Sequence, residues 1–351
     1  MVAGACLATL SLAMGTAMAD PSGAPTFRDL AGTGSDTTQG VMNSLSNLIT
    51  IGGTKEIGSY DAASPTNSAQ ITTKDPAVNP NCTINRPSGS GAGLDALVAA
   101  RNATTPPAPK CLQFARSSKD DHATRAGQHL TYIPFATDAV AYAVLQTSSI
   151  NKRLSVATLK SIYTCDPNFT GFTPLLPQFG SGTRQFFLQN ILGLTDSPTY
   201  TTSNSCVSDN DPIDPTRKLL ENTGNRLLSD SSTSPTAKQQ IEPYAISSYI
   251  AQTANTVSDV HGRTVLGNIG GINSLTINGN AVGTRPVFNV VPNVLVQSGP
   301  HTQNVFVGGT SQVCTNAGAI QSLGFATRSD CGSTAIQTDT SNGADTVGPG
   351  E

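Results

Sequence analysis

The sequence predicts an α/β fold of about two domains, on three observations. The chain has 351 residues, which corresponds to roughly two domains of about 150 residues each. Short β-type runs alternate with segments whose apolar residues repeat at helical spacing, as in α/β architectures. Three of the expected helices directly follow loops rich in Gly, Ser and Thr.

The expected elements follow one another along the chain in this alternating order. Val41, Leu45 and Leu48 repeat at the spacing of one helix face, and Leu94, Leu97 and Val98 mark a second helix. Further helices are expected at 154–163 and 185–192, and strands at 30–36, 112–115, 131–135, 139–145 and 174–178.

The last third of the chain has a different pattern. Asn278-Gly279 lies between β-type runs and predicts a hairpin turn, and residues 284–296 are expected to be extended. Residues 332–351 are rich in Gly, Ser, Thr and Asp, which predicts a flexible tail.

Composition excludes several classes of protein. A hydrophobic content of 37% excludes a wholly disordered chain, and a charged content of 12% excludes a coiled coil. The chain has 20 Lys+Arg and 23 Asp+Glu, a net charge of -3, and no basic stripe. We therefore expect no nucleic-acid partner and no binding to anionic membrane surfaces.

The first residues have the pattern of an export signal. Residues 2–19 are apolar and end in Ala17-Met18-Ala19, where small residues fit cleavage after Ala19. We expect a signal peptide over 1–19 and a secreted, extracellular protein, with cell-envelope association left open. Two alternatives are an uncleaved membrane anchor and lipidation at Cys6.

The cysteines agree with export. Removal of residues 1–19 leaves six of the seven cysteines, and an even number in an exported chain indicates disulfides. Pairing of sequence neighbours is the simplest of the possible connectivities. None of the six lies in a Cys-x-x-Cys motif or near a histidine, so we expect neither a metal site nor another cofactor. The expected pairs are Cys82–Cys111, Cys165–Cys206 and Cys314–Cys331.

Three loops suggest a binding site. Residues 34–39, 88–93 and 180–184 each combine Gly with Ser or Thr before an expected helix. Free N–H groups at a helix start and nearby hydroxyls bind anions, so three such loops at one point would form an oxyanion site without a metal. The alternative is ordinary helix capping. Arg116 and Arg184 stand beside these loops, where each could clamp an oxyanion or form an ion pair.

At these loops the sequence resembles the phosphate-type periplasmic substrate-binding proteins of ABC transporters. It resembles especially the secreted versions of high-GC Gram-positive bacteria (actinobacteria). The resemblance covers about residues 30–250, and Gly-Ser-Gly-Thr is its most specific piece. It rests on the segments Gly34-Ser35-Asp36-Thr37-Thr38, Gly89-Ser90-Gly91-Ala92-Gly93-Leu94, Phe114-Ala115-Arg116-Ser117-Ser118 and Gly180-Ser181-Gly182-Thr183.

The resemblance implies two α/β lobes joined by two crossover strands, with the ligand in the cleft between them. The crossovers would lie near Phe135 and near residues 243–246. Lobe 1 would combine 26–134 with 244–351, and lobe 2 would be 135–243. The implied ligand-binding residues are Thr37 or Thr38, Ser90, Gly91, Arg116, Ser117, Ser118, Ser181, Gly182, Thr183 and Arg184.

The sequence departs from the family pattern in two places. Ser118 stands where the family usually has an Asp that accepts the proton of hydrogen phosphate. Pro177-Gln178-Phe179 stands where an Arg-x-Asp usually precedes Gly-Ser-Gly-Thr. Arg116 and Arg184 are candidates to supply the missing charge. The fold expectation is unaffected, whereas the identity of the anion is left open.

These patterns predict a monomeric, non-enzymatic protein that captures an oxyanion, phosphate first. An ABC-transporter permease is a possible partner. One alternative is a secreted phosphatase or other hydrolase that uses a serine of the cleft. It would need a general base, and no histidine lies beside the three loops. The other alternative is an extracellular scaffold or adhesion protein with a vestigial cleft.

Overall fold

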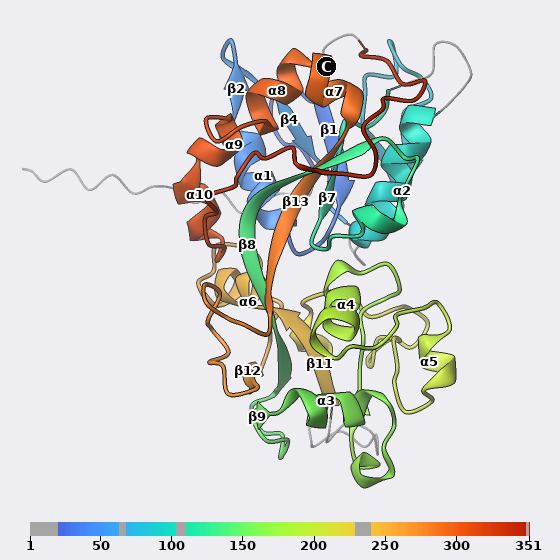
Figure 1. The fold of residues 1–351 in the computed structure, drawn as a ribbon, viewed down its shortest axis with the longest axis vertical. Helices are drawn as coiled ribbons and strands as arrows, with labels where there is room; N and C mark the ends of the chain where they lie inside the picture. Colours follow the sequence, from blue (N-terminus) through green and yellow to red (C-terminus); the bar gives the residue numbers. More distant parts are fainter. Residues whose placement is uncertain (1–19, 63–67, 103–109, 229–239, 349–350) are drawn as a thin grey trace, which may run out of the picture.

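A computed structural model describes residues 20–62, 68–102, 110–228, 240–348 and 351. The chain forms two lobes, drawn one above the other in Figure 1. Two long strands run between them, β8 (Leu130–Leu145) and β13 (Thr284–Pro292), and they pair antiparallel. The expected signal peptide, 1–19, lies outside the described residues.

Lobe 1 is built on a sheet with apolar cores on both faces. Its strands are ordered β4-β1-β7-β13-β8, and β1 is parallel to both β4 and β7. Leu30 and Ala31 of β1 belong to different cores, because successive strand residues point to opposite faces. The elements are β1 (Leu30–Gly34), α1 (Gln39–Leu48), β4 (Ile57–Ser59), α2 (Gly89–Asn102) and β7 (Phe114–Ser117).

Short elements complete lobe 1. Val305, Phe306, Val313 and Ile320 from its later helices pack in the same core as α1. These helices are α7 (Asn293–Ser298), α8 (Pro300–Phe306), α9 (Gln312–Thr315) and α10 (Ala317–Ser322). Two small hairpins pair β2 (Thr50–Ile51) with β3 (Thr54–Lys55) and β5 (Gln70–Thr72) with β6 (Thr83–Asn85).

Lobe 2 is assembled around the second half of β8. There β8 pairs antiparallel with β11 (Gln240–Ala245) and β12 (Thr264–Ile269). Helices enclose a core that includes Tyr142, Leu159 and Phe187. The remaining elements of lobe 2 are β9 (Arg153–Leu154), α3 (Val156–Tyr163), β10 (Thr173–Pro174), α4 (Gly182–Phe186) with a π-helical turn η3 (Phe187–Ile191), α5 (Tyr200–Ser203) and the 3₁₀ turns η2 (Pro167–Phe169) and η4 (Gly224–Arg226). Helix α6 (Ile246–Thr253) lies at the boundary and contributes Ala251 to the core of lobe 1, and the 3₁₀ turn η1 (His122–Thr124) belongs to lobe 1.

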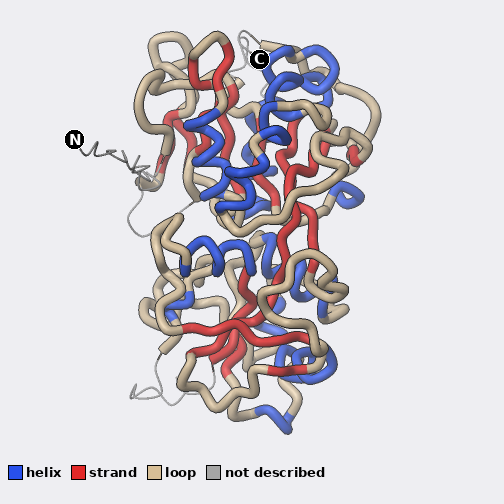
Figure 2. The backbone as a smooth tube through the Cα atoms, turned by 90° about the vertical axis from the view of Figure 1, so that its left-hand side faces the viewer, coloured by secondary structure: helices blue, strands red, loops and turns tan. Residues whose placement is uncertain are grey.

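The second crossing differs from the sequence expectation. Residues 243–245 lie in β11, which pairs with β8 inside lobe 2, and the chain returns to lobe 1 along β13. Figure 2 shows the two strands that link the lobes. Residues 264–283 therefore belong with lobe 2, because Val265, Ile269 and Val282 pack in its core.

The same arrangement corrects the expected hairpin at Asn278-Gly279. Strands β12 and β13 both pair with β8, β12 at Tyr142–Leu145 and β13 at Leu130–Ala139, and not with each other. The crossing itself is irregular. The β8–β13 register shifts between Val287 and Phe288, and Pro134 and Pro286 lie close to that shift.

The segment expected to be a flexible tail is docked on lobe 1. Within it, β14 (Ile336–Gln337) pairs with β8, and Asp345 accepts a hydrogen bond from Arg101 Nε at 2.8 Å. Arg101 also pairs with Glu351, which is only 3% exposed. Arg101 is buried in α2 and needs counter-charges, and the acidic residues of this segment supply them.

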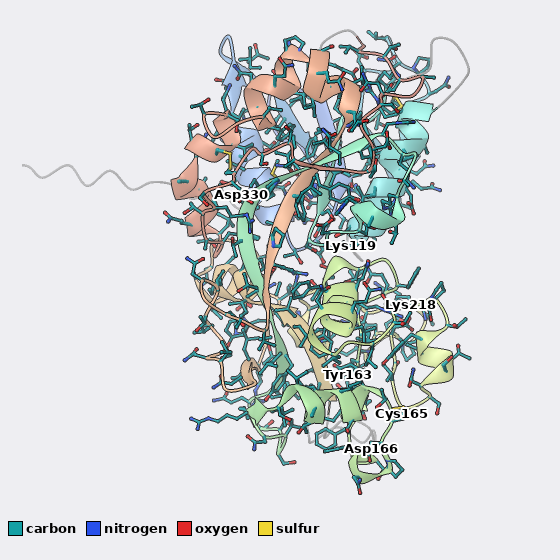
Figure 3. The ribbon with its side chains drawn as sticks, viewed as in Figure 1. Lys119, Tyr163, Cys165, Asp166, Lys218 and Asp330 are labelled. Carbon is teal, nitrogen blue, oxygen red and sulfur yellow. A yellow bond between two sulfur atoms is a disulfide. The ribbon has the colours of Figure 1, made fainter. Side chains whose placement is uncertain are left out.

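The three expected disulfides are confirmed. The Cα atoms of Cys82–Cys111, Cys165–Cys206 and Cys314–Cys331 are 5.1, 5.6 and 5.8 Å apart. Each bridge lies within one lobe, as Figure 3 shows for Cys165 in the lower lobe. Among the helices of the described ranges, none has the length and apolar character needed to cross a membrane.

Candidate functional site

The three Gly/Ser/Thr loops meet where the lobes touch. Ser35 Oγ donates a hydrogen bond to Ser118 Oγ at 3.0 Å, and Ser90 Oγ lies 3.3 Å from Ser118 Oγ. The backbone N–H of Gly91 donates to the carbonyl of Gly180 at 3.0 Å. The ends of β1 and β7 and the start of α2 are thereby joined to the loop of lobe 2 that precedes α4.

Gly182 allows this close approach. A Cβ atom built at Gly182 would lie 2.3 Å from Ser118 Oγ and 2.5 Å from Ser90 Oγ, closer than any side-chain carbon tolerates. Beside it, Lys119 Nζ reaches from lobe 1 and donates to Gln185 Oε1 of α4 at 2.5 Å. Figure 3 places Lys119 at the boundary between the lobes.

Hydrogen-bond donors from both lobes converge on the carboxylate of Glu221. Thr37 Oγ1 of lobe 1 donates to Glu221 Oε2 at 2.8 Å, and Thr183 Oγ1 of lobe 2 donates to the same oxygen at 3.2 Å. The Thr183 N–H points at Glu221 Oε1 at 3.5 Å. Glu221 is 1% exposed. The protein's own carboxylate, itself an oxyanion, thus occupies a point reached by donors from both lobes.

Arg285 supplies the cation next to these donors. Its Nη2 donates to Thr183 Oγ1 at 3.0 Å and to Asp138 Oδ2 at 2.7 Å, and its Nη1 donates to the carbonyl of Ser118 at 3.1 Å. Arg285 is 1% exposed and Asp138 is fully buried. Because Arg285 lies in β13 and Asp138 in β8, this ion pair ties the two crossing strands to the hydroxyls.

The guanidinium groups of Arg116 and Arg184 are engaged elsewhere. Arg116 Nη1 donates to Ser59 Oγ at 2.9 Å and to the carbonyl of Tyr60 at 2.8 Å. Burial lowers the pKa of Arg116 to about 10. Arg184 pairs with Asp196 at 2.9 Å and with Asp209 at 3.2 Å. In this structure neither contacts Glu221 or the two threonines.

Other residues singled out from the sequence have local roles. Ser181 Oγ accepts from the N–H of Arg184 and caps α4, which matches the capping alternative. Ser117 Oγ donates to the carbonyl of Lys119 at 2.9 Å. Thr38 Oγ1 is buried without a hydrogen-bond partner in the described part of the chain.

Sequence reasoning missed Glu221 and Arg285, although Arg285 left a signal. It is the only Asp, Glu, Lys or Arg between Arg263 and Arg328. A lone charge in a long uncharged segment that includes the β-type run at 284–292 could have marked Arg285 as a buried, paired cation. Glu221 lies in a polar loop, Leu220-Glu221-Asn222, with no distinctive spacing.

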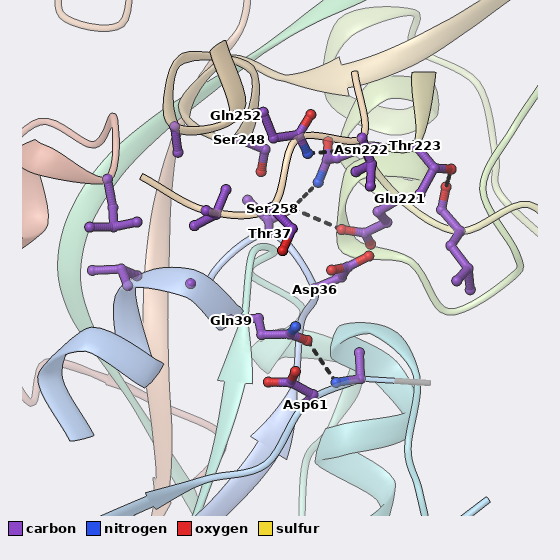
Figure 4. A pocket seen from close by; sticks show the side chains of 18 of the residues that line it. Asp36, Thr37, Gln39, Asp61, Glu221, Asn222, Thr223, Ser248, Gln252 and Ser258 are labelled. Atoms are coloured by element: carbon purple, nitrogen blue, oxygen red, sulfur yellow. Dashed lines mark hydrogen bonds between the residues drawn. The ribbon is translucent and has the colours of Figure 1, made fainter. Parts of the chain in front are cut away.

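A cavity of about 530 Å³ adjoins Glu221 (Figure 4). Asp36, Asp61, Asp211 and Glu221 are among its lining residues, and its one arginine, Arg226, pairs with Asp211 at 2.7 Å. Burial raises the pKa of Asp36 to about 8, with Glu221 and Asp61 adding to the rise and the nearby Arg116 opposing it. The cavity wall is therefore acidic.

Two α/β lobes, two crossing strands and polar groups that converge from both lobes are the features of the two-lobed fold of periplasmic binding proteins. A family model of the PBP superfamily domain matches residues 24–293. The chain belongs to this superfamily, which confirms the resemblance seen in the sequence at the level of family and fold. No curated protein matches the chain significantly in sequence.

Solved structures that are similar to the chain are described as proteins of phosphate transport. One is a phosphate ABC transporter substrate-binding protein with bound phosphate from Clostridium perfringens, with 14% identity, a TM-score of 0.53, and coverage of 85% of this chain and 99% of that chain. Another is an ABC-type phosphate transport receptor from Vibrio cholerae, with 15% identity, a TM-score of 0.49, and coverage of 85% and 100%.

Proposed function

We propose that this chain is a secreted, monomeric solute-binding protein that captures a small oxyanion, phosphate first, between its lobes. One observation carries the proposal: hydroxyl and N–H donors of Thr37 and Thr183, one residue from each lobe, converge on a single carboxylate. Hydroxyl and N–H donors that bind a carboxylate in this way can also bind another oxyanion, such as phosphate. The bound phosphate of the Clostridium perfringens structure, which has the same fold, supports this reading.

The anion would replace Glu221 at these donors. It would accept hydrogen bonds from Thr37 Oγ1 and Thr183 Oγ1, with the charge of Arg285 close by. The serines that complete the proposed site are Ser90, Ser118 and Ser181, beside Gly91 and Gly182.

Ser118 bears on the choice of anion. A carboxylate at this place would accept the proton of hydrogen phosphate and repel sulfate, which carries none. A serine hydroxyl both donates and accepts, so it does not repel a fully ionised anion. We therefore expect weaker discrimination of phosphate from sulfate than the family pattern would give.

Calorimetric titration of the purified chain with phosphate and with sulfate tests the proposal. We expect both to bind, and Thr183→Val to weaken binding about tenfold, because one hydrogen bond to a charged group contributes roughly 1.5–3 kcal/mol. Thr302→Val is the matched control, since Thr302 is also buried but its hydroxyl lies in α8 without a partner in the described structure. Absence of heat with both anions would reject the proposal.

Export and transport form a separate part of the proposal. Three disulfides support an oxidising compartment, and the apolar residues 2–19 support cleavage after Ala19. N-terminal sequencing of protein recovered from the culture medium should begin at Asp20.

An ABC permease as partner is supported by the description of the Clostridium perfringens structure. Co-purification of the chain with membrane proteins would test that partnership directly.

A further inference from the structure

The sequence contains the dipeptide Asn-Gly twice, and the two copies have different surroundings. Asn278-Gly279 lies in the segment between β12 and β13, and Asn342-Gly343 lies in the C-terminal segment that is docked on lobe 1. An asparagine before a glycine is prone to lose its side-chain amide spontaneously, because glycine has no Cβ to shield its backbone nitrogen. The folded structure then determines which of the two copies can react.

Asn278-Gly279 has free space around it. Both residues are exposed, and a Cβ atom built at Gly279 would meet no heavy atom of the described structure within 4 Å. Neither the side-chain amide of Asn278 nor the N–H of Gly279 forms a hydrogen bond with the described residues. Gly279 has a φ of 74°, and the turn is closed by a long bond from the Asn280 N–H to the Ile277 carbonyl, at 3.4 Å. The Gly279 nitrogen is therefore accessible, and the turn can rotate to bring it to the amide.

Asn342-Gly343 is packed and held in place. Asn342 Nδ2 donates a hydrogen bond to Gln297 Oε1 at 2.9 Å, and Asn342 Oδ1 is buried. A Cβ atom built at Gly343 would lie 2.5 Å from Cδ2 of His129, so the imidazole ring covers this glycine. Attack on the Asn342 amide would first require the docked segment to open locally, and the free energy of that opening slows the reaction.

We propose that Asn278 is a site of spontaneous covalent modification, at which the side-chain amide is lost and water is the only co-reactant. The backbone nitrogen of Gly279 attacks Cγ of Asn278, so that a new C–N bond forms and the bond from Cγ to Nδ2 breaks. The N–H proton of Gly279 leaves with Nδ2 as ammonia, and a five-membered succinimide ring remains. Water then opens the ring at one of its two carbonyls and leaves either aspartate or isoaspartate at position 278. Nothing is oxidised or reduced in these steps.

The modification would loosen the chain just before β13. Asn280 is 7% exposed, and its Oδ1 accepts hydrogen bonds from the N–H groups of Val282 and Gly283 at 3.1 and 2.8 Å. These bonds position the residues that lead into β13, which begins at Thr284. Isoaspartate at 278 lengthens the main chain two residues before Asn280 and adds a negative charge. We therefore expect the isoaspartate form to melt at a lower temperature than the unmodified protein.

Incubation of the purified chain in a mildly alkaline buffer, folded and in parallel unfolded in guanidinium with its disulfides intact, tests the inference. Peptide mass spectrometry follows the conversion of both asparagines. We expect Asn278 to convert at least tenfold faster than Asn342 in the folded protein, and at a similar rate in the unfolded chain, where the docking of Asn342 is lost. Hydroxylamine, which cleaves a succinimide, should cut the folded chain after Asn278. Equal rates in the folded protein, or faster conversion at Asn342, would overturn the inference.

Gly279→Ala is the matched variant, because it adds one methyl group beside the attacking nitrogen at a position with free space. It should slow conversion at Asn278 several-fold and leave Asn342 unchanged. An unchanged rate at Asn278 in this variant would show that the Gly279 nitrogen is not the attacking group. Separation of the incubated protein by charge, followed by melting curves of each form, measures the loosening. Equal melting of the isoaspartate and unmodified forms would contradict it. The phosphate titration is made with fresh protein, so the two proposals fail separately.

Discussion

The boundary between the lobes has two sides, which differ in whether their charged side chains are paired. On one side is the hydroxyl cluster of Ser35, Ser90, Ser118, Thr37 and Thr183, where Arg285 is fully paired with Asp138 and Gly182 leaves no free space. On the other side is the carboxyl-lined cavity, where Asp36 has no such partner and about 530 Å³ is empty of protein. The comparison shows that the lobes meet closely where the charged groups are paired, and that open space remains where the carboxyls have no hydrogen-bonded counter-charge.

Breaking the pair on the hydroxyl side should have the largest effect. Arg285→Met leaves Asp138 charged and fully buried without its partner. We expect a loss of about 3–5 kcal/mol in the free energy of unfolding, the usual cost of an orphaned buried charge. Denaturant unfolding measures it. The double variant Arg285→Met with Asp138→Asn should regain part of the loss, and no recovery would show that the ion pair is not the cause.

Glu242 is a second buried carboxyl whose pKa is raised by burial and, to a smaller extent, by the nearby Asp211. Burial raises its pKa from 4.5 to about 8, so between these values the folded protein holds a proton that the unfolded chain has released. Stability therefore falls as pH rises through this window, by up to about 1.4 kcal/mol per pH unit.

Glu242→Gln does not titrate, and the variant should gain about 3 kcal/mol over the parent when the pH rises from about 5 to about 8. Melting curves at both values measure the difference. A difference that is the same at both pH values would contradict the raised pKa.

Adding a methyl group at Gly182, in the hydroxyl cluster, tests how closely the lobes must approach. Gly182→Ala places a methyl group within 2.3 Å of Ser118 Oγ. We expect a cost of about 1–3 kcal/mol, because an overpacked interface must shift apart, and a weaker response to phosphate. Gly171→Ala is the control, since a Cβ there meets nothing within 4 Å. Equal stability of both variants would show that the lobes move apart without cost.

The smallest effect is expected at Glu221, which stands between the two sides. Glu221→Gln keeps the shape of the side chain but removes the charge that competes for Thr37 and Thr183. We expect phosphate to bind several-fold more tightly, with a stability change of about 1 kcal/mol. Calorimetric titration of both proteins measures this. Weaker binding in the variant would mean that Glu221 assists the anion instead of competing with it.

Local patterns in the sequence predicted local structure well. The helical spacing of Val41, Leu45 and Leu48 predicted α1, and the nearest cysteines are the ones that pair. The three Gly/Ser/Thr loops converge, and the parallel pairing of β1 with β7 accounts for one part of this, the approach of Ser35 after β1 to Ser118 after β7. These features depend on residues close in sequence or on a simple sheet rule.

Long-range features could not be predicted in the same way. The contact of Arg285 with Thr183 joins residues 102 positions apart, and the choice of β13 over residues 243–246 as the second crossing depends on which core accepts Val265 and Val282. The docking of residues 336–348 depends on Arg101, whose burial no local pattern reveals. The Gly, Ser, Thr and Asp content of this segment predicted a flexible tail, but its acidic residues pair with the buried Arg101 and hold the segment on lobe 1.

The crossing of β8 and β13 has a mechanical consequence. Pro134 and Pro286 have no N–H to donate, and both lie close to the register shift between Val287 and Phe288. The two-stranded ribbon that links the lobes therefore lacks some backbone hydrogen bonds near its middle. We expect this ribbon to resist stretching but to twist where the hydrogen bonds are missing, so that the two lobes rotate relative to each other about that point.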